Sequence, residues 1–358
     1  MDKQIISKSG QSFWLDYIDR ELINSGTLSK YINEFGLKGL TSNPSIFLQA
    51  ITKTDYYNKE LQNLKTKKIS DAYSGFLEIA IKDIQQAAAL FTPIYELTNK
   101  QDGYVSIELP PNIANNVEES IKEAKNIFYR INMPNIMIKV PGTDSGIKIF
   151  SELIYLGINV NVTLLFDCGM YRKFADAYVV ALKKRSDNGQ SINHIASVAS
   201  FFVSRIDATI DPMHNIKELK GKIAVANATK AYKQFLEVFS GDVWESLKSQ
   251  GAMAQRPLWA STSTKNPAYS DILYVQELFA DQTVNTLPEK TLLAFFDHGK
   301  TPTNIDNQKI KEAEQVLEKL KNSNIELNQV TSKLLHDGLE AFQNDFNALM
   351  LSIEEYIE

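Results

Sequence analysis

The stretch Ile136-Met-Ile-Lys139-Val-Pro141 places a lysine inside a short apolar run that is rich in β-branched residues. Such a run favours a strand over a helix. Successive side chains of a strand point to opposite faces, so Met137 and Lys139 are expected on one face and Ile138 and Val140 on the other. The ammonium of Lys139 must therefore be desolvated or paired with a carboxylate.

Two interpretations of Lys139 follow from this position. Desolvation disfavours the charged form of a lysine and lowers its pKa, which prepares an amine to attack a carbonyl and form a Schiff base. The structural alternative is a lysine that reaches solvent from the end of its strand or forms an ordinary ion pair. The remaining strands of the chain decide between the two.

Short apolar segments alternate with segments of helical periodicity along the chain. One such helix is expected from about Asp19 to Phe35. The expected strands lie near residues 13–18, 39–43, 105–110, 136–141, 159–166, 257–261 and 283–288 and within the stretch 195–207. Strand–helix alternation predicts a parallel sheet with right-handed crossovers. About eight such units favour a closed (β/α)8 barrel, the TIM barrel, over an open doubly wound sheet.

Polar residues lie within or at the ends of different predicted strands. They are Asp16, Asn43, Glu108, Lys139, Asn161, Thr163, Ser200 and Ser261. In a barrel these positions converge on the interior and on the C-terminal mouth, where active sites of this fold are built. The distribution therefore predicts a site and favours the catalytic interpretation of Lys139.

The chain contains no linker, low-complexity tract or short repeat that would divide it. We therefore expect a single domain over residues 1–358, with the barrel at about 10–300 and a C-terminal helical extension at about 304–358. The extension has an apolar stripe from Leu334 to Ile353. This stripe is expected to pack on the barrel rather than to bind a partner or a membrane.

Composition excludes several classes of protein. The 358 residues include 38 basic and 43 acidic side chains, and a net charge of −5 provides no basic surface for nucleic acid or an anionic membrane. The single cysteine, Cys168, fits a reducing compartment. The segment Met1–Gly10 has no apolar region of signal-peptide length, and no later run approaches the roughly 18 apolar residues of a membrane span. A cytoplasmic location is expected.

Signals for cofactors are weak. The segment Gly142-Thr-Asp-Ser-Gly146-Ile-Lys148 lacks the ending of a phosphate loop and is expected to be a strand-to-helix turn. The histidines are scattered without paired spacing, so we expect no His or Cys metal site. A dinucleotide fingerprint is absent. Carboxylates could still hold magnesium, which keeps a metal-dependent alternative open.

Two motifs carry a resemblance to a known family. Gly39-Leu-Thr-Ser-Asn-Pro44 resembles the first transaldolase signature, and Ile136–Gly146 resembles the second, which surrounds the Schiff-base lysine. Segments that follow in the family's order are Asn161–Phe166, Ser200–Arg205 and Trp259–Ser261. The resemblance covers about residues 10–300, and the segments Lys265–Asp271 and Thr283–Pro288 are similar to a longer bacterial subgroup within the class I Schiff-base aldolase superfamily.

The resemblance implies an activity and roles for the catalytic residues. A dihydroxyacetone unit would be transferred from sedoheptulose 7-phosphate to glyceraldehyde 3-phosphate, giving erythrose 4-phosphate and fructose 6-phosphate in the non-oxidative pentose phosphate pathway. Lys139 would be the nucleophile, and Asp16 the acid/base on the hydroxyl whose deprotonation starts cleavage. Glu108 and Thr163 would move protons through a water during imine formation. The iminium is the electron sink, so no metal or cofactor is expected.

The resemblance also implies substrate contacts. Thr41 belongs to the substrate-binding set, in which Asn43 and Asn161 would hold hydroxyls of the three-carbon unit, Ser200 and Phe202 would shape the pocket, and Arg205 and Ser261 would bind phosphate. Many transaldolases carry an arginine two residues after the serine that corresponds to Ser261, but Ser263 stands here. Lys265 is assigned as the second phosphate cation, with a solvated loop lysine as the alternative.

Other functions remain open on the sequence. A fructose 6-phosphate aldolase would share the lysine but release the three-carbon unit to water. A metal-dependent lyase would not need Lys139, and a non-enzymatic binding protein would need no nucleophile. Sugar phosphates are the expected partners, with no nucleic acid and no membrane, and the chain is expected to be a monomer or a homodimer.

Overall fold

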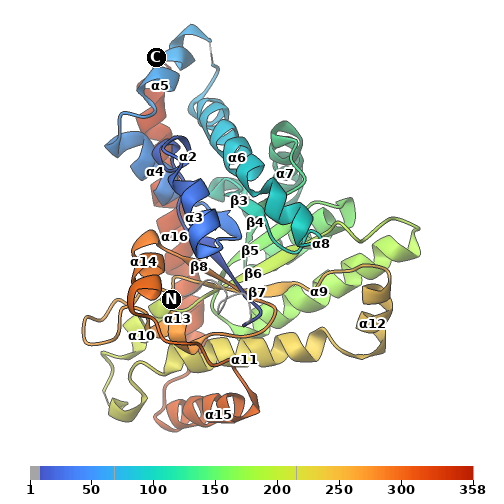
Figure 1. Cartoon of the computed structure of the whole chain (residues 1–358), viewed down its shortest axis with the longest axis vertical. Helices are drawn as coiled ribbons and strands as arrows, with labels where there is room; N and C mark the ends of the chain where they lie inside the picture. The colour runs from blue at the N-terminus through green and yellow to red at the C-terminus, as the bar shows by residue number, and fades with distance from the viewer. Residues whose placement is uncertain (1–8, 68, 215, 358) are drawn as a thin grey trace.

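The structure, a computed structural model, describes residues 9–67, 69–214 and 216–357. The remaining residues, including most of the Met1–Gly10 segment considered above for a signal peptide, lie outside this part. In the described part, eight parallel strands pair in sequence order and β8 closes on β1 (Figure 1). The strands are β1 Gln11–Leu15, β2 Gly39–Thr41, β3 Tyr104–Glu108, β4 Ile136–Pro141, β5 Val160–Leu165, β6 Ser197–Phe202, β7 Arg256–Ala260 and β8 Thr283–Leu287. The predicted (β/α)8 barrel is confirmed.

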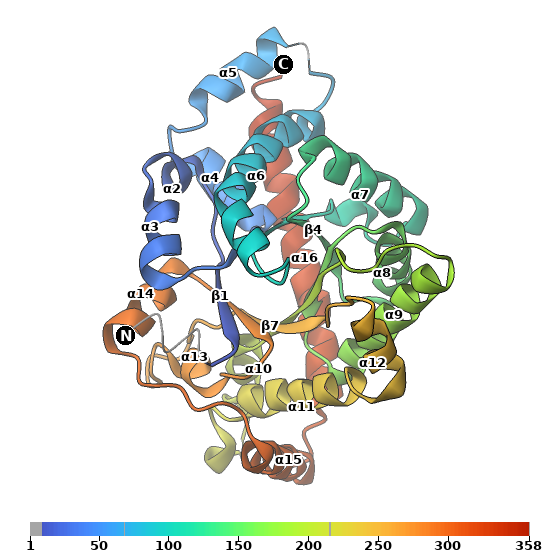
Figure 2. The same cartoon turned by 45° about the vertical axis from the view of Figure 1, so that its right-hand side comes forward.

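Helices surround this barrel on its outer side (Figures 1 and 2). The α-helices are α2 Arg20–Asn24, α3 Thr27–Phe35, α4 Pro44–Lys53, α5 Asn58–Thr66, α6 Ala72–Leu97, α7 Val117–Ile131, α8 Asp144–Leu156, α9 Cys168–Asp187, α10 Ser204–Ile210, α11 Ile223–Val238, α12 Gly241–Ser249, α13 Leu273–Glu277, α14 Glu289–His298, α15 Asn307–Asn322 and α16 Leu327–Glu354. Two short 3₁₀ helices are η1 Pro111–Ile113 and η2 Lys217–Leu219. Because helices cover the outside and side chains fill the inside, every residue of β1, β4, β5, β6 and β8 is buried.

The prediction of a single helix from about Asp19 to Phe35 is wrong in one respect. The structure has two helices there, α2 and α3, separated at Ser25 and Gly26. Gly26 has φ +80°, a left-handed conformation that interrupts a right-handed helix and that glycine adopts without steric cost.

The turn after the lysine strand is as predicted. β4 ends at Pro141 and α8 begins at Asp144, with the Thr143 side chain accepting a hydrogen bond from the backbone N–H of Gly146. A Cβ on Gly146 would lie 2.0 Å from the carbonyl oxygen of Pro141, so the tight turn requires glycine at that position. Gly142–Gly146 thus links a strand to a helix.

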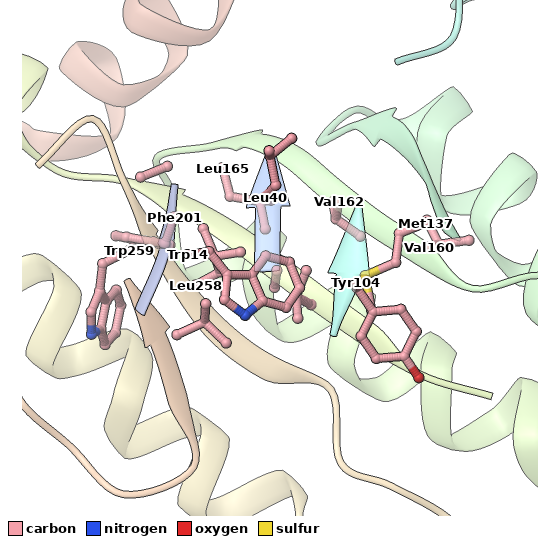
Figure 3. Close-up of a cluster of buried hydrophobic side chains, with 14 of the residues drawn as sticks. Trp14, Leu40, Tyr104, Met137, Val160, Val162, Leu165, Phe201, Leu258 and Trp259 are labelled. Carbon is pink, nitrogen blue, oxygen red and sulfur yellow. The ribbon is translucent and has the colours of Figure 1, made fainter. Parts of the chain in front are cut away.

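Large hydrophobic side chains are buried on both faces of the barrel strands, among them Trp14, Met137, Phe201 and Trp259 (Figure 3). Strand alternation puts Trp14 on the same face as Asp16, and Met137 on the same face as Lys139. Both Trp14 and Met137 are buried, and a Cβ on Gly39 would lie 2.6 Å from the Trp14 ring. These side chains fill the middle of the barrel below Asp16 and Lys139, which lie toward its C-terminal end, where active sites of this fold are built.

A polar network lies at the N-terminal end of the barrel, where its members Ser12, Asp102 and Arg256 line a cavity of about 440 Å³. Asp102 accepts hydrogen bonds from Ser12 Oγ at 2.7 Å and Trp14 Nε1 at 3.2 Å, and its Oδ1 lies 2.8 Å from the Arg256 guanidinium. Asp102 lies in the loop before β3, and its partners come from β1 and β7. The network satisfies buried polar atoms and fixes the strands at the end opposite the cavity described below.

The long helix α16 runs from beside α15 to beside α5 in both views (Figures 1 and 2). It packs against α4, α6, α10 and β5. Leu334, Leu349 and Ile353 are buried on its apolar stripe, whereas Leu351 on another face is 63% exposed. The prediction that this stripe packs on the barrel is confirmed. Within the described residues, no helix combines the length and apolarity needed to cross a membrane.

Candidate active site

A cavity of about 150 Å³ opens at the C-terminal end of the barrel. It is lined by Asp16, Thr41, Asn43, Lys139, Thr163, Ser200, Phe202, Arg205, Ala260, Ser261, Ser263, Lys265, Thr286, Pro288 and Phe342. Ten of the residues assigned to the site from the sequence are in this set. The other two, Glu108 and Asn161, lie directly behind it and contact lining residues, as shown below. The structure therefore brings the whole predicted set together.

Lys139 lies at the base of this cavity and is only 5% exposed. The register of the sheet places it beside Glu108 on β3 and Asn161 on β5. Its Nζ lies 2.6 Å from Glu108 Oε1 and donates to the carbonyl oxygen of Ser42 at 2.8 Å. The lysine is thus both desolvated and paired, and its amine faces a carboxylate that can exchange a proton with it.

Glu108 is a buried carboxyl held against this amine. Burial raises the pKa of Glu108, the charge of Lys139 opposes that rise, and the nearby Asp16 adds to it. Among the described residues, Glu108 Oε2 and Thr163 Oγ1 are buried atoms without a hydrogen-bond partner. Thr163 lies in the second half of β5, directly before Leu164, whose φ is +57° and where the register of the β5–β6 pair shifts. Such an irregularity re-aims a side chain next to a site.

Asp16 follows β1 and is held by backbone and side-chain contacts. Its backbone N–H donates to the carbonyl oxygen of Leu287 at 2.8 Å, and its Oδ1 accepts from Thr41 Oγ1 at 2.7 Å. Burial raises the pKa of Asp16, while the charge of Lys139 and the hydrogen bond from Thr41 oppose the rise. Asp16 is therefore a carboxyl whose pKa lies above its ordinary value and whose position is fixed in the cavity wall.

Neutral polar groups line the cavity beside these ionisable residues. Asn43 caps α4, because its Oδ1 accepts from the Ile46 backbone N–H at 3.0 Å, which leaves its amide donors free to face the cavity. Ser200 Oγ donates to Asn161 Oδ1 at 2.7 Å, and Asn161 Nδ2 donates to Ser106 Oγ at 3.1 Å. Asn161 is fully buried, so it supports the lining from behind and fixes the Ser200 hydroxyl.

Two cations lie at one end of the cavity. Burial lowers the pKa of Arg205, and burial together with Arg205 lowers the pKa of Lys265. Neither side chain has an ion-pair partner among the described residues. Lys265 Nζ donates to Ser263 Oγ at 2.9 Å, and the Arg205 guanidinium lies over the Phe202 ring, 5.5 Å from its centroid. Ser261 lies beside them with φ +54°, and its hydroxyl is 3.1 Å from Ser204 Oγ. Unpaired cations beside hydroxyls can bind a phosphate dianion.

Several groups of the site were not predicted from the sequence. The carbonyl of Ser42 was missed because a backbone atom leaves no sequence signal. Ser106 stands between Val105 and Ile107 in β3, and this alternation is the signal that could have revealed it. Thr286 directly follows Asn285 in β8, so no such alternation marks it. Phe342 lines the cavity from α16, and its helical spacing indicates only an apolar face.

In the described part of the chain, no three His, Cys, Asp or Glu side chains lie together so as to hold a metal ion. The ionisable groups of the cavity are Lys139, Glu108, Asp16, Arg205 and Lys265. They provide a nucleophile, two carboxyls and an anion-binding end.

Comparison with known proteins agrees with this arrangement. The family described as Transaldolase/Fructose-6-phosphate aldolase matches residues 13–353. The chain belongs to the transaldolase/fructose-6-phosphate aldolase family. It is 41% identical over 371 positions to a protein named Transaldolase from Trichodesmium erythraeum, covering 99% of this chain and 97% of that protein. A protein named Transaldolase from Saccharopolyspora erythraea is 38% identical over 99% of this chain and 97% of its own length.

Membership of the transaldolase/fructose-6-phosphate aldolase family confirms the resemblance found in the two sequence motifs. It also confirms the expected class of enzyme, one that transfers aldehyde or ketone residues. Because the match extends to residue 353, it includes α15 and most of α16 as well as the barrel.

Proposed function

We propose that the chain is a transaldolase that transfers a dihydroxyacetone unit from sedoheptulose 7-phosphate to glyceraldehyde 3-phosphate through a Schiff base on Lys139. The observation that supports this most strongly is the buried Lys139 amine, 2.6 Å from Glu108 Oε1 and in the same cavity as Asp16. The relatives named Transaldolase favour transfer to a sugar acceptor over release to water. The proposed place is the non-oxidative pentose phosphate pathway.

Imine formation uses Lys139, Glu108 and Thr163. The Lys139 ammonium passes a proton to Glu108 and the free amine attacks the ketose carbonyl carbon, forming a carbinolamine. Loss of its hydroxyl as water requires proton delivery, and Glu108 is the adjacent carboxyl whose raised pKa suits it for holding that proton. The unpartnered Glu108 Oε2 and Thr163 Oγ1 provide polar contacts for a water that shuttles the proton.

Carbon–carbon cleavage uses Asp16 as the base. Asp16 takes the proton of the ketose hydroxyl, the new carbonyl forms, and the adjacent carbon–carbon bond breaks. Its electron pair moves into the iminium to give an enamine on Lys139, and the aldehyde product leaves. In the second half-reaction the enamine carbon attacks the acceptor aldehyde, Asp16 returns the proton to the new alkoxide, and water hydrolyses the imine to release the new ketose.

Binding uses neutral groups at one end and cations at the other. Asn43 and Ser200 hold the three-carbon unit by hydrogen bonds, with Phe202 as an apolar wall. Asn161 and Thr41 support this binding from the side, because Asn161 accepts from Ser200 and Thr41 donates to Asp16. Arg205, Ser261 and Lys265 bind the phosphate group. The pairing of a neutral polyol site with a cationic end matches the chemistry of a sugar phosphate and keeps added charge away from the nucleophile.

The decisive assay measures transfer directly. Fructose 6-phosphate and erythrose 4-phosphate are supplied together, and glyceraldehyde 3-phosphate and free dihydroxyacetone are quantified. Transaldolase activity predicts that glyceraldehyde 3-phosphate forms with the acceptor and that little dihydroxyacetone is released. Acceptor-independent release of dihydroxyacetone would instead identify a fructose 6-phosphate aldolase.

The setting of the enzyme is also a proposal. We infer one domain over residues 1–358, a cytoplasmic location, sugar phosphates as partners, and a monomer or homodimer as the oligomeric state. The lone, buried and free Cys168 and the net charge of −5 support a reducing compartment and a partner set without nucleic acid.

A further inference from the structure

Thr286 is the only lining residue that the cavity receives from β8 in the described chain, and the mechanism above gives it no role. Its Oγ1 lies 2.7 Å from Thr41 Oγ1, which in turn lies 2.7 Å from Asp16 Oδ1. Thr286 and Thr41 are 3% and 2% exposed. Thr286 on β8, Thr41 on β2 and Asp16 directly after β1 thus form a chain of hydrogen bonds that ends on the proposed base.

Counting protons gives this chain a direction. A threonine hydroxyl has one proton to donate and lone pairs to accept with. When Asp16 is a carboxylate it can only accept a hydrogen bond, so the Thr41 hydroxyl donates its one proton to the hydrogen bond with Asp16. The contact between Thr41 and Thr286 then requires Thr286 to donate.

We propose that Thr286 is a positioning residue for the transfer reaction. It donates a hydrogen bond to Thr41 and thereby orients the Thr41 hydroxyl so that it donates to the Asp16 carboxylate. The inference rests on the proposed function of Asp16 as the base. Successive hydrogen bonds polarise one another, so the bond from Thr286 strengthens the bond from Thr41 to Asp16, by roughly 10–30%.

The sign of the effect follows from the charge on Asp16. A hydrogen bond to a carboxylate is about twice as strong as one to a neutral acid, so support from Thr286 favours the ionised form. Lys139 on β4 also favours it, whereas Glu108 on β3 opposes it. Arg205 and Lys265 are the other charged groups that line the cavity. None of these groups changes in a variant of Thr286.

Thr286→Val tests the inference, because valine keeps the branched shape and loses the hydroxyl. Asp16 must be ionised to take the substrate proton, so kcat falls as the pH drops through its pKa. Without Thr286 the pKa of Asp16 rises, and the acidic limb of the kcat profile is expected to move upward by roughly 0.3–0.5 pH unit. Thr286→Ser keeps the donor and is expected to retain the wild-type limb.

The measurement is the pH dependence of glyceraldehyde 3-phosphate formation, sampled at fixed times so that coupling enzymes do not enter. Thr283→Val is the matched control, since Thr283 is a buried threonine of the same strand whose hydroxyl donates to the Ala280 carbonyl oxygen. It is expected to leave the limb in place. Thermal unfolding of each variant confirms that a folded protein is compared.

Each outcome decides the inference. If the acidic limb of the kcat profile moves to higher pH in Thr286→Val but stays at the wild-type pH in Thr286→Ser, the inference is supported. A higher KM in Thr286→Val with an unchanged acidic limb overturns the inference and makes Thr286 a substrate contact. An equal shift of the acidic limb in Thr286→Ser also overturns it, because the effect then comes from packing. Asp16→Asn is assayed separately: if its acidic limb persists, the proposed role of Asp16 fails, and this inference fails with it.

Discussion

Glu108 and Lys139 are register partners on adjacent parallel strands, and Glu108 Oε1 lies 2.6 Å from Lys139 Nζ. Their side chains are 9% and 6% exposed, so the contact is shielded from solvent. An ion pair in this setting is costly to desolvate, and a purely apolar pair would serve stability equally well. The arrangement is explained by proton exchange, because an amine must lose a proton before it attacks a carbonyl.

Glu108→Gln removes the proton acceptor and keeps the shape. We expect kcat to fall about 10²- to 10⁴-fold, which is the usual contribution of a positioned acid or base. Stopped-flow measurement of imine formation checks this result. Glu123→Gln is a control, because Glu123 accepts a hydrogen bond from Tyr73 Oη and does not line the cavity. A wild-type rate in Glu108→Gln would contradict the assigned role.

Arg205→Ala and Lys265→Ala test the phosphate end of the cavity. Loss of charge-assisted hydrogen bonds is expected to raise KM for fructose 6-phosphate about 10- to 100-fold in Arg205→Ala and about 3- to 10-fold in Lys265→Ala. KM for unphosphorylated fructose is expected to change little. The exposed ion-pair residue Lys183 provides the control variant Lys183→Ala. If Lys265→Ala matches that control, Lys265 is a solvated loop lysine.

Phe342→Ala tests the contribution of α16 to the cavity. Phe342 lines the cavity, whereas Phe346 one turn later packs near Tyr73, with ring centroids 6.1 Å apart. We expect Phe342→Ala to raise KM by roughly three- to tenfold, because about 1 kcal/mol of apolar contact with the substrate is lost. Phe346→Ala is expected to keep KM and to lower the free energy of unfolding by about 3 kcal/mol. Equal KM values in the two variants would remove α16 from substrate binding.

The pH dependence of stability is set in part by Asp207. Burial raises its pKa to about 6, although the Ala224 backbone N–H and Tyr274 Oη donate to it. A carboxyl whose pKa is higher when folded than unfolded binds its proton more tightly in the folded state. Its stabilising contribution is therefore complete below the unfolded value of about 3.9 and is lost as the pH rises through about 6.

Asp207→Asn should separate this effect from the titration of other groups. From pH 4 to pH 8, the free energy of unfolding of the wild type is expected to fall by about 1–3 kcal/mol relative to that of the variant. Urea unfolding at several pH values measures the difference. A difference between the two proteins that is independent of pH would show that Asp207 has an ordinary pKa.

The strand-borne part of this site was predictable from sequence, and the reason is geometric. Lys139 and Glu108 stand on parallel strands of one barrel, so alternation alone places them on the interior. Phe342 was not predictable, because it reaches the cavity only through the packing of α16 on α4 and α10. The partnership of Thr41 with Thr286 depends on the closure of β8 onto β1, which a linear pattern does not specify.

The most direct test of the account is borohydride reduction in the presence of fructose 6-phosphate, followed by proteolysis and mass spectrometry. We predict a reduced dihydroxyacetone adduct on Lys139 in the wild type and none in Lys139→Met. An adduct on another lysine, or full transfer activity in Lys139→Met, would contradict it.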